Sequence, residues 1–220
     1  MRRIARFFTT IFYKPLLIRW LSKERDYLHD GIRLSVHPQV FHPGFFFSTK
    51  LLLKQVSALP LEGKTFLELG AGSGLISISA AQQGAAVTAS DINPVAVSYL
   101  KRNAAANQVS LSVVESDLFS AVPPRIFDII AINPPYYFQT PVNWKEYAWY
   151  CGKNGEYFAG LFAELGNYVD RESVILMVLC DGVHRTRVQQ IANERGFELE
   201  CVKQAGNLLE KNFIYRIHPQ

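Results

Sequence analysis

Residues 66–78 read FLELGAGSGLISI, and this stretch decides the class of fold. Apolar residues typical of a buried strand run into Gly70, Gly72 and Gly74, after which a second apolar run begins a helix. A strand that turns through glycines into a helix is a unit of open α/β sheets, which bind ligands at the carboxyl ends of their strands. A dinucleotide-binding turn would carry its third glycine at position 75, where this chain has Leu75. The GxGxG spacing therefore favours a ligand that lies across the turn, with no pyrophosphate at the helix N-terminus.

The rest of the chain alternates strands and helices. The predicted strands are 32–36, 39–41, 65–69, 86–90, 111–115, 127–132, 173–180, 197–202 and 212–217, and the predicted helices are 48–59, 74–84, 94–107, 155–169 and 184–196. The first two strands are expected to form a short hairpin. The later strands are continuously apolar, which indicates a mostly parallel sheet covered by helices on both faces.

The charge of the chain is concentrated at its N-terminus. Residues 1–26 hold seven basic and two acidic residues, a net charge of +5, whereas the whole chain is +4, which leaves −1 for the remainder. We expect residues 1–30 to be a basic amphipathic helical extension and residues 31–220 to be one domain. Apolar residues recur at helical spacing through residues 4–21, interrupted at Pro15. This segment is expected to pack on the domain or on a second copy of the chain. Attachment to a membrane surface and contact with phosphates remain alternatives.

The cysteines and histidines give no metal signature. Cys151, Cys180 and Cys201 are scattered without a CxxC pair, and no histidine lies at ligand spacing from them. His37 and His42 are each followed by a proline, which favours a turn-rich hairpin over a metal site. No metal site and no disulfide framework are expected, and a reducing, cytoplasmic compartment is predicted. No stretch reaches the roughly 18 uninterrupted apolar residues of a spanning helix.

Three carboxylates accompany the first three strands of the parallel series. Glu68 lies within the first strand, Asp91 ends the second, and Asp117 follows the third. Asp91 could accept hydrogen bonds from two ribose hydroxyls, and Glu68 could face an ammonium group of the ligand or brace the turn. Asp91 and Asp117 could instead cap local structure. Their order along one sheet edge, together with the glycine turn, favours a binding site.

A fourth strand ends in an unusual corner. Residues 129–137 read IIAINPPYY, so a buried strand stops at Asn133 and is followed by two prolines and two tyrosines. Neither proline has an N–H to donate, and each restricts the residue before it to an extended conformation. The corner is therefore stiff and rich in hydrogen-bond acceptors. Alone it could be a strand exit, but behind the glycine turn and the carboxylates it predicts a reactive site.

These segments carry a family resemblance. LELGAGSG (67–74), ASDINPVAVSYLKRNAAAN (89–107), VVESDLF (113–119) and FDIIAINPPYY (127–137) resemble, in order, the motifs of class I S-adenosyl-L-methionine (SAM)-dependent methyltransferases. The tetrapeptide NPPY is similar to that of enzymes that methylate planar amide or exocyclic amino nitrogens. Within these, the chain most resembles the HemK-like glutamine methyltransferases of the methyltransferase small domain group, over about residues 39–218. VFHPGFFFSTKLLL (40–53) and AWYCGKNGEYF (148–158) support this, with Cys151 where the family usually has glycine.

The resemblance implies a fold, a cofactor and a site. The fold would be a Rossmann-like, doubly wound, mostly parallel seven-stranded sheet with an antiparallel last hairpin. The cofactor would be SAM. Its binding residues would be Glu68, Gly70, Gly72, Gly74, Asp91, Ile92, Asp117, Leu118 and Asn133, and the catalytic residues Asn133, Pro134, Pro135 and Tyr136. Ser48 and Thr49 are expected to cap a helix N-terminus, and by resemblance to lie near the methionine end of SAM.

The chemistry expected at the corner is methyl transfer to a planar nitrogen. If the side-chain oxygen of Asn133 and the carbonyl of Pro134 both accept from an NH2 group, the nitrogen lone pair is directed for in-line attack. Tyr136 would offer a flat face to the planar group. No general base is required, because the methylated nitrogen can lose its proton to water.

The sequence leaves the methyl acceptor open. Only the N-terminus is strongly basic, which argues mildly against a large nucleic-acid footprint. We expect a protein glutamine side chain as the acceptor, with adenine N6 of RNA or DNA as the alternative. The 38 residues ahead of the resemblance are fewer than the helical substrate domain of bacterial release-factor methyltransferases, so release factor itself is not favoured. A second alternative is a SAM-binding module that acts by binding a partner through its N-terminal helix.

Overall fold

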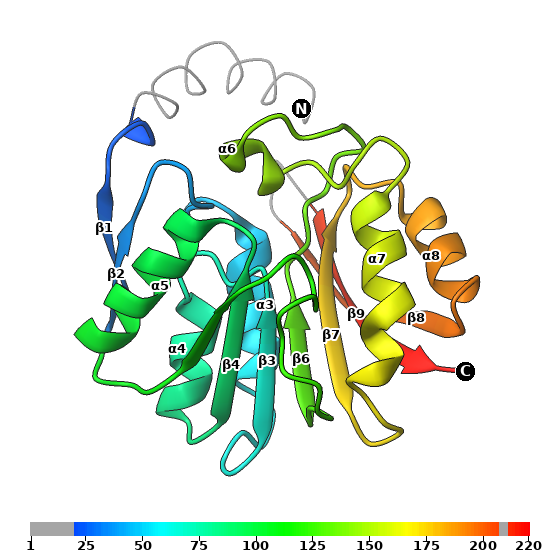
Figure 1. The fold of residues 1–220 in the computed structure, drawn as a ribbon, viewed down its shortest axis with the longest axis horizontal. Coiled ribbons are helices and arrows are strands. Elements are labelled where there is room, and N and C mark those ends of the chain that lie inside the picture. Colours follow the sequence, from blue (N-terminus) through cyan, green and yellow to red (C-terminus); the bar gives the residue numbers. More distant parts are fainter. Residues whose placement is uncertain (1–19, 207–210) are drawn as a thin grey trace.

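The computed structural model describes residues 20–206 and 211–220. Its centre is a seven-stranded sheet with the strand order β5-β4-β3-β6-β7-β9-β8 (Figure 1). The strands are β3 (Thr65–Leu69), β4 (Ala86–Asp91), β5 (Ser112–Glu115), β6 (Ile129–Ile132), β7 (Val174–Cys180), β8 (Phe197–Gly206) and β9 (Lys211–Pro219). The first five pair in parallel, and β9 runs antiparallel between β7 and β8. The predicted doubly wound sheet with an antiparallel last hairpin is confirmed.

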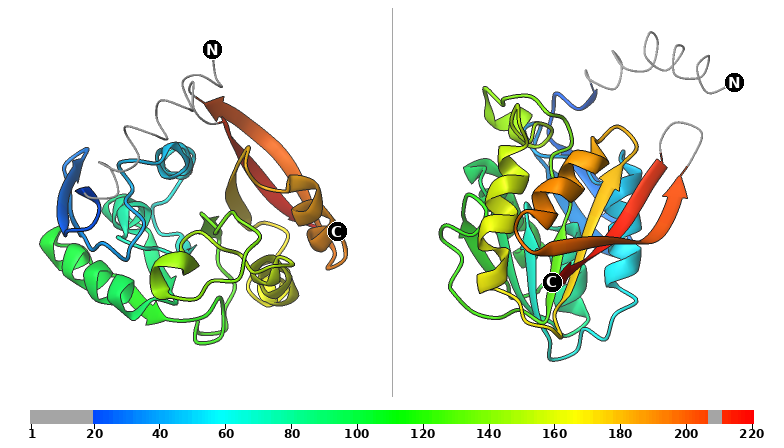
Figure 2. Two further views of the ribbon diagram at one scale, coloured as in Figure 1. Left: turned by 90° about the horizontal axis from the view of Figure 1, so that it is seen from above. Right: turned by 90° about the vertical axis from the view of Figure 1, so that its right-hand side faces the viewer.

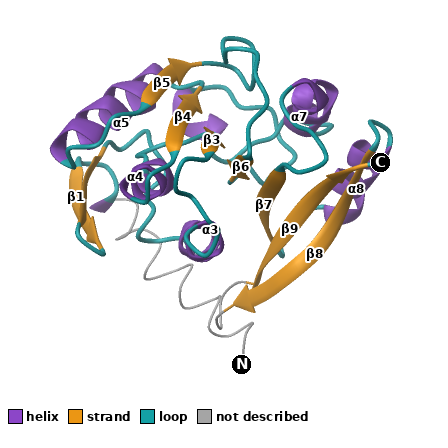
Figure 3. Ribbon diagram, turned by 90° about the horizontal axis from the view of Figure 1, so that it is seen from below, coloured by secondary structure: helices purple, strands orange, loops and turns teal. Residues whose placement is uncertain are grey.

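Helices cover both faces of the sheet. They are α3 (Phe47–Val56), α4 (Leu75–Gln82), α5 (Pro94–Ala106), α6 (Trp144–Tyr147), α7 (Glu156–Glu164) with a 3-10 turn η2 (Leu165–Asn167), and α8 (Arg185–Asn193). Figure 3 shows α3, α4 and α5 on one side of the sheet and α7 and α8 on the other. Neighbouring residues of β3 enter different cores: Phe66 packs with the first group of helices and Leu67 with the second. This alternation is what a strand buried on both faces requires.

The last two strands form the edge of the sheet. The β8–β9 hairpin is long and twisted, and it stands out at one side of the molecule (Figure 2). The register of the pair shifts between Cys201 and Lys203. Beyond the first three residues of β8 the strand is largely exposed, as is common for a strand at the edge of a sheet.

The N-terminal part of the described chain differs from the prediction. The hairpin consists of β1 (Arg25–His29) and β2 (Ile32–Val36), while residues 39–41 are not a strand. Pro38 and Pro43 flank that segment and remove backbone donors that a strand would need. The extension was expected to be helical through residue 30, but its last part is strand β1. This strand pairs with β2, which lies on the other side of the expected domain boundary at residues 30 and 31. Residues 1–19, which hold most of the predicted amphipathic segment 4–21, lie outside the described residues.

The sheet places the functional loops together. β3 lies between β4 and β6, so the chain leaves it on one side toward β4 and later returns to β6 on the other. At such a reversal the loops after neighbouring strands diverge, and a crevice opens at the carboxyl ends of the strands. The loops that follow β3, β4, β5 and β6 therefore meet at one edge of the sheet.

Candidate active site

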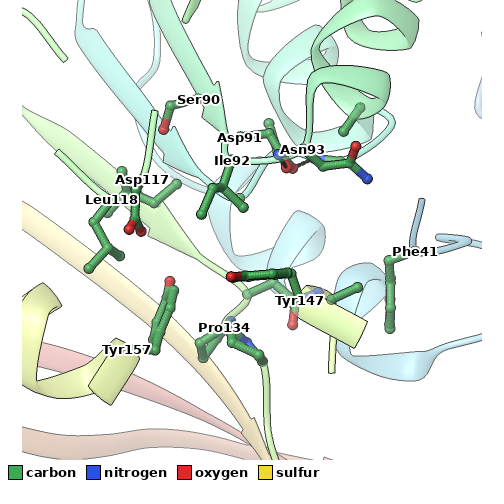
Figure 4. Close-up of a pocket in the computed structure, with 18 of the residues that line it drawn as sticks. Phe41, Ser90, Asp91, Ile92, Asn93, Asp117, Leu118, Pro134, Tyr147 and Tyr157 are labelled. Carbon is green, nitrogen blue, oxygen red and sulfur yellow. Dashed lines mark hydrogen bonds between the residues drawn. The ribbon is translucent and has the colours of Figure 1, made fainter. Parts of the chain in front are cut away.

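A cavity of about 640 Å³ lies at this edge of the sheet. Its volume is within the roughly 300–1,000 Å³ of small-molecule sites. Figure 4 shows side chains from the loops after β4, β5 and β6 and from α6 and α7 directed into it. Eleven of the twelve residues named as site candidates from the sequence line this cavity; the twelfth, Gly74, lies at the start of α4 behind the turn.

The glycine turn is held against β4 by its main chain. The N–H groups of Gly70 and Ala71 both donate to the Ser90 carbonyl, each at 2.9 Å. Gly70, Gly72 and Gly74 have φ of +73°, +55° and +87°, which residues with a side chain adopt only at a cost. At Gly74 a Cβ would also come within 2.2 Å of the Leu100 side chain. Gly74 is thus required by packing between α4 and α5 as well as by the turn.

Asp91 ties the glycine turn to the end of β4. Its Oδ2 accepts from the N–H of Gly72 at 2.8 Å, and its Oδ1 from the N–H of Asn93 at 2.9 Å. Burial raises the pKa of Asp91, and these backbone donors oppose the shift. Each carboxylate oxygen still has an acceptor position for a ligand. The helix N-cap that Asp91 was considered for is instead supplied by Asn93, whose Oδ1 accepts from the N–H of Val95.

Glu68 braces the turn from inside the sheet. It is 5% exposed, and its Oε2 accepts from both the N–H and the hydroxyl of Ser77 in α4. Burial raises the pKa of Glu68 to about 8. Of the two roles considered for this residue, the bracing role has contacts in the structure, and Glu68 also reaches the cavity wall.

Asp117 and Leu118 form a strained turn after β5. Leu118 has φ of +48°, in the left-handed region that a branched side chain rarely adopts. The hydroxyl of Ser116 donates to the Leu118 carbonyl and accepts from the N–H of Ala121, both at 2.9 Å, which holds the turn in place. Strained residues of this kind cluster at functional sites.

Tyr157, on α7, faces this turn across the cavity (Figure 4). Burial and the carboxylates of Asp91 and Asp117 raise the pKa of Tyr157, so its hydroxyl stays protonated. Gly160, one turn further along α7, leaves room for Leu118, because a Cβ there would come within 2.8 Å of the Leu118 side chain. The first turn of α7 and the Asp117–Leu118 turn therefore form one wall of the cavity.

The side-chain amide of Asn133 is held from two sides. Its Nδ2 donates to the hydroxyl of Thr49 at 3.2 Å, and its Oδ1 accepts from the hydroxyl of Tyr136. Oδ1 keeps a second lone pair for another donor. Thr49 is 7% exposed and lies in the first turn of α3. The prediction that Ser48 or Thr49 caps this helix was wrong, since the N-cap position is Phe46 and carries no side-chain bond.

The proline corner is fixed by main-chain bonds to the segment after α6. The Trp149 carbonyl accepts from the N–H groups of Tyr136 and Tyr137, at 2.9 and 2.8 Å, and the N–H of Cys151 donates to the Tyr137 carbonyl at 2.9 Å. Within residues 20–206 and 211–220, no hydrogen bond ends on the Pro134 carbonyl. Two acceptors, Asn133 Oδ1 and Pro134 O, are thus presented on a rigid corner.

Tyr136 differs from what its motif suggested. It is 6% exposed and packs in the core beside α7, so its ring has little free face, while its hydroxyl holds Asn133. The sequence also missed Thr49 as a partner of Asn133, and it missed Trp144, Tyr147 and Tyr157 as cavity residues. Trp144 and Tyr147 lie in α6, which is only four residues long, so no periodic pattern marks them in the sequence.

The cavity has an acidic lining. Five acidic side chains reach it, from Glu68, Asp91, Asp117, Glu156 and Glu164, whereas its lining within the described part of the chain includes no Lys, Arg or His. Glu68 keeps its proton near neutral pH, because burial raises its pKa to about 8, so the negative charge comes from the other four. A wall of this kind favours a positively charged ligand and disfavours phosphates. Over the same residues, no group of three or more His, Cys, Asp or Glu could hold a metal ion, and no helix is long and apolar enough to cross a membrane.

Comparison with known proteins identifies the family. Residues 31–146, more than half of the chain, match the family "Methyltransferase small domain". The chain belongs to this family. A Methanocaldococcus jannaschii protein, provisionally named a protein N5-glutamine methyltransferase, is 39% identical over 155 residues, which cover 66% of this chain and 75% of that protein. The resemblance stated from the sequence motifs is confirmed, and the chain is a SAM-dependent methyltransferase.

Other members of the methyltransferase group resemble the chain over smaller shares. Ribosomal RNA small subunit methyltransferase C of Hamiltonella defensa is 30% identical over 138 residues, 62% of this chain and 40% of that protein. The solved 16S rRNA N2 G1207 methyltransferase of T. thermophilus, in complex with AdoMet and guanosine, has a TM-score of 0.64 at 20% identity and covers 90% of this chain and 50% of that one. The chain spans half or less of these two proteins. The likeness to the T. thermophilus enzyme, at 20% identity, shows only that the fold is shared.

The cavity of this methyltransferase fits SAM. The sulfonium and ammonium groups of SAM are cationic, and the part of the lining that the structure describes offers carboxylates and no cationic side chain. Asp91 keeps acceptor positions at the end of β4, and the apolar side chains of Ile92 and Leu118 lie in the same cavity (Figure 4).

Proposed function

We propose that this SAM-dependent methyltransferase transfers a methyl group to the side-chain amide nitrogen of a protein glutamine. The observation that carries the proposal is the cavity lining, which combines two acceptors at the Asn133–Pro134 corner with five acidic side chains and, among the described residues, no cationic side chain. A glutamine amide is neutral, whereas a nucleotide brings phosphates that an acidic wall repels. The name of the M. jannaschii relative supports the same acceptor class.

The cofactor half of the site is assigned by chemistry. We assign the ribose hydroxyls of SAM to Asp91, the adenine ring to the space beside Ile92 and Leu118 with Asp117 at its edge, and the amino-acid end to the glycine turn and Glu68. When bound, SAM supplies a methyl group on a sulfonium sulfur; the C–S bond breaks as the new C–N bond forms, and its electron pair stays on sulfur. The domain that holds this site is proposed to be residues 31–220, with β1 pairing to it from the preceding extension.

The acceptor half orients a weak nucleophile. The amide nitrogen of glutamine is delocalised into its carbonyl, so it must be turned out of conjugation before it reacts. Asn133 Oδ1 and the Pro134 carbonyl accept from its two N–H groups and stabilise the positive charge that develops on nitrogen. Thr49 and Tyr136 hold the Asn133 amide in place for this, at hydrogen-bond distance on either side. The methylated nitrogen then releases one proton to water.

An exocyclic amine of a nucleobase is the second candidate acceptor. It has the same planar NH2 geometry, and the 30% identity to an rRNA methyltransferase favours it. The basic residues of the N-terminal segment are the available source of phosphate contacts in this case.

The test is label transfer from methyl-tritiated SAM into a lysate of the source organism that lacks its own copy of the gene. Wild-type enzyme is compared with Asn133→Ala, and the products are digested with protease or with nuclease. Protease-sensitive label that disappears with Asn133→Ala, together with N5-methylglutamine after hydrolysis, supports the proposal. Nuclease-sensitive label would move the assignment to a nucleobase. Calorimetry of SAM binding to Asn133→Ala shows that the variant is folded and separates any contribution of Asn133 to cofactor binding from its role toward the acceptor.

A further inference from the structure

The corner needs a flat surface on which a planar acceptor can pack, and Tyr136 does not provide one. Its ring is 6% exposed and its hydroxyl is used to hold Asn133. A planar amide that approaches Asn133 and Pro134 therefore requires an aromatic neighbour from another element. This requirement rests on the proposed function.

Two aromatic residues of α6 meet the requirement. Trp144 and Tyr147 both line the cavity, yet 42% of Trp144 and 40% of Tyr147 are exposed. Their rings pack on each other with centroids 5.5 Å apart. Figure 4 shows the Tyr147 side chain extending from α6 into the cavity. Large aromatic side chains that remain this exposed beside a cavity are typical of binding surfaces.

The element that carries them is fixed. Asn143 and Glu146 cap each other: Asn143 Oδ1 accepts from the N–H of Glu146 at 3.2 Å, and Glu146 Oε1 accepts from Asn143 Nδ2 at 3.0 Å. Glu146 Oε2 also accepts from the N–H of Val142 at 2.9 Å.

The same element is joined to the proline corner. The N–H of Trp149 donates to the Glu146 carbonyl, and the Trp149 carbonyl accepts from both tyrosine amides of the corner. Tyr147 is therefore held at a set position relative to Asn133, and little ordering is needed when an acceptor binds.

We propose that Tyr147, supported by Trp144, is the residue on which the methyl acceptor stacks, and that it determines which acceptors are used. The acceptor enters between Tyr147 and the Asn133–Pro134 corner with its amide plane against the tyrosine ring. Stacking uses the aromatic face of Tyr147 and not its hydroxyl, so a Tyr147→Phe variant should retain acceptor binding.

The experiment measures the initial rate of label transfer from methyl-tritiated SAM over a dilution series of the same lysate. The variants are Tyr147→Ala, Tyr147→Phe and, as a matched control, Tyr137→Ala. Tyr137 is 43% exposed on the neighbouring segment and is not among the described residues that line the cavity. SAM affinity is measured by calorimetry for each purified variant, which also shows that each is folded.

The expected result is an apparent KM for acceptor about tenfold higher in Tyr147→Ala, the size of one lost aromatic stacking contact. Tyr147→Phe and Tyr137→Ala should stay within about threefold of wild type, and SAM affinity should be unchanged in all three. If Tyr147→Ala transfers protease-sensitive label with the wild-type apparent KM for acceptor, this inference is overturned and the proposed function stands. Loss of SAM affinity in Tyr147→Ala, or equal defects in Tyr147→Ala and Tyr147→Phe, would also overturn it.

Digestion of the labelled product with protease or nuclease identifies the class of acceptor independently of the Tyr147 variants. Nuclease-sensitive label with the tenfold Tyr147 effect would overturn the glutamine assignment while supporting the stacking role. No label in any wild-type fraction would overturn both.

Discussion

Replacing Gly74 by alanine separates the packing role of the glycine turn from its ligand role. Gly74 precedes α4 with φ of +87°, and an added Cβ would lie 2.2 Å from Leu100 Cδ1. Leu100 is fully buried, so its side chain has no free space into which to move. The left-handed conformation costs a non-glycine residue about 1–2 kcal/mol. Overpacking a core side chain adds about 1–3 kcal/mol.

The sum predicts that Gly74→Ala lowers the free energy of unfolding by about 2–5 kcal/mol. For a chain of this size that corresponds to a fall in Tm of roughly 4–20 °C. The matched control is Gly63→Ala, where φ is +71° but nothing lies within 4 Å of an added Cβ. The control should lose only the conformational part, about 1–2 kcal/mol.

Urea unfolding followed by circular dichroism measures both variants. A larger loss for Gly74→Ala than for Gly63→Ala supports the packing explanation. Equal losses, or a Gly74→Ala variant with wild-type stability and weakened SAM binding alone, would refute it and return Gly74 to a purely ligand-binding role.

Two further predictions concern the carboxylates. Asp91→Asn places an amide NH2 against one of the two backbone donors, from Gly72 or Asn93, and removes the charge that complements SAM. We expect SAM affinity to fall at least about tenfold and the free energy of unfolding to fall by about 1.5–3 kcal/mol. Calorimetry that finds an unchanged SAM affinity would contradict the assignment of Asp91. For Glu68 the pKa is raised from 4.5 in the unfolded chain to about 8 in the folded protein. The folded state therefore holds the proton more tightly, so its contribution to stability is fully present below pH 4.5 and is lost as pH rises through about 8. Glu68→Gln should remove that decline, which amounts to at most about 5 kcal/mol. Parallel pH profiles of Tm for the two proteins would show that Glu68 does not titrate in this way.

Local patterns were enough to predict most of the fold and most of the residues that meet at the cavity. The strand–glycine–helix unit at residues 66–78 and the acids at strand ends are short-range features, and parallel topology then brings them to one edge. Asp91 contacts the turn that precedes it by 19 residues, as that topology requires.

The acceptor half depends on contacts that the sequence does not encode locally. Thr49 meets Asn133 across 84 residues of chain, and Tyr136 is buried in a core cluster that draws its residues from distant elements, α7 among them. α6 is four residues long, so it has no period from which a helix could be recognised. β1 was missed because its burial alternates only weakly, with no residue fully buried.

The main-chain bonds that join the proline corner to the Trp149 segment bear on how acceptor preference can change over time. Those bonds involve carbonyl and N–H groups, which every residue except proline supplies in full. Side chains at positions 144 and 147 can therefore be exchanged without altering the frame that presents them, and without touching the loops that hold the cofactor. The scaffold thus separates the loops proposed to hold the methyl donor from a segment whose side chains can be exchanged to suit the methyl acceptor. Transplanting residues 140–148 between family members is accordingly a direct route to redirecting the methyl group.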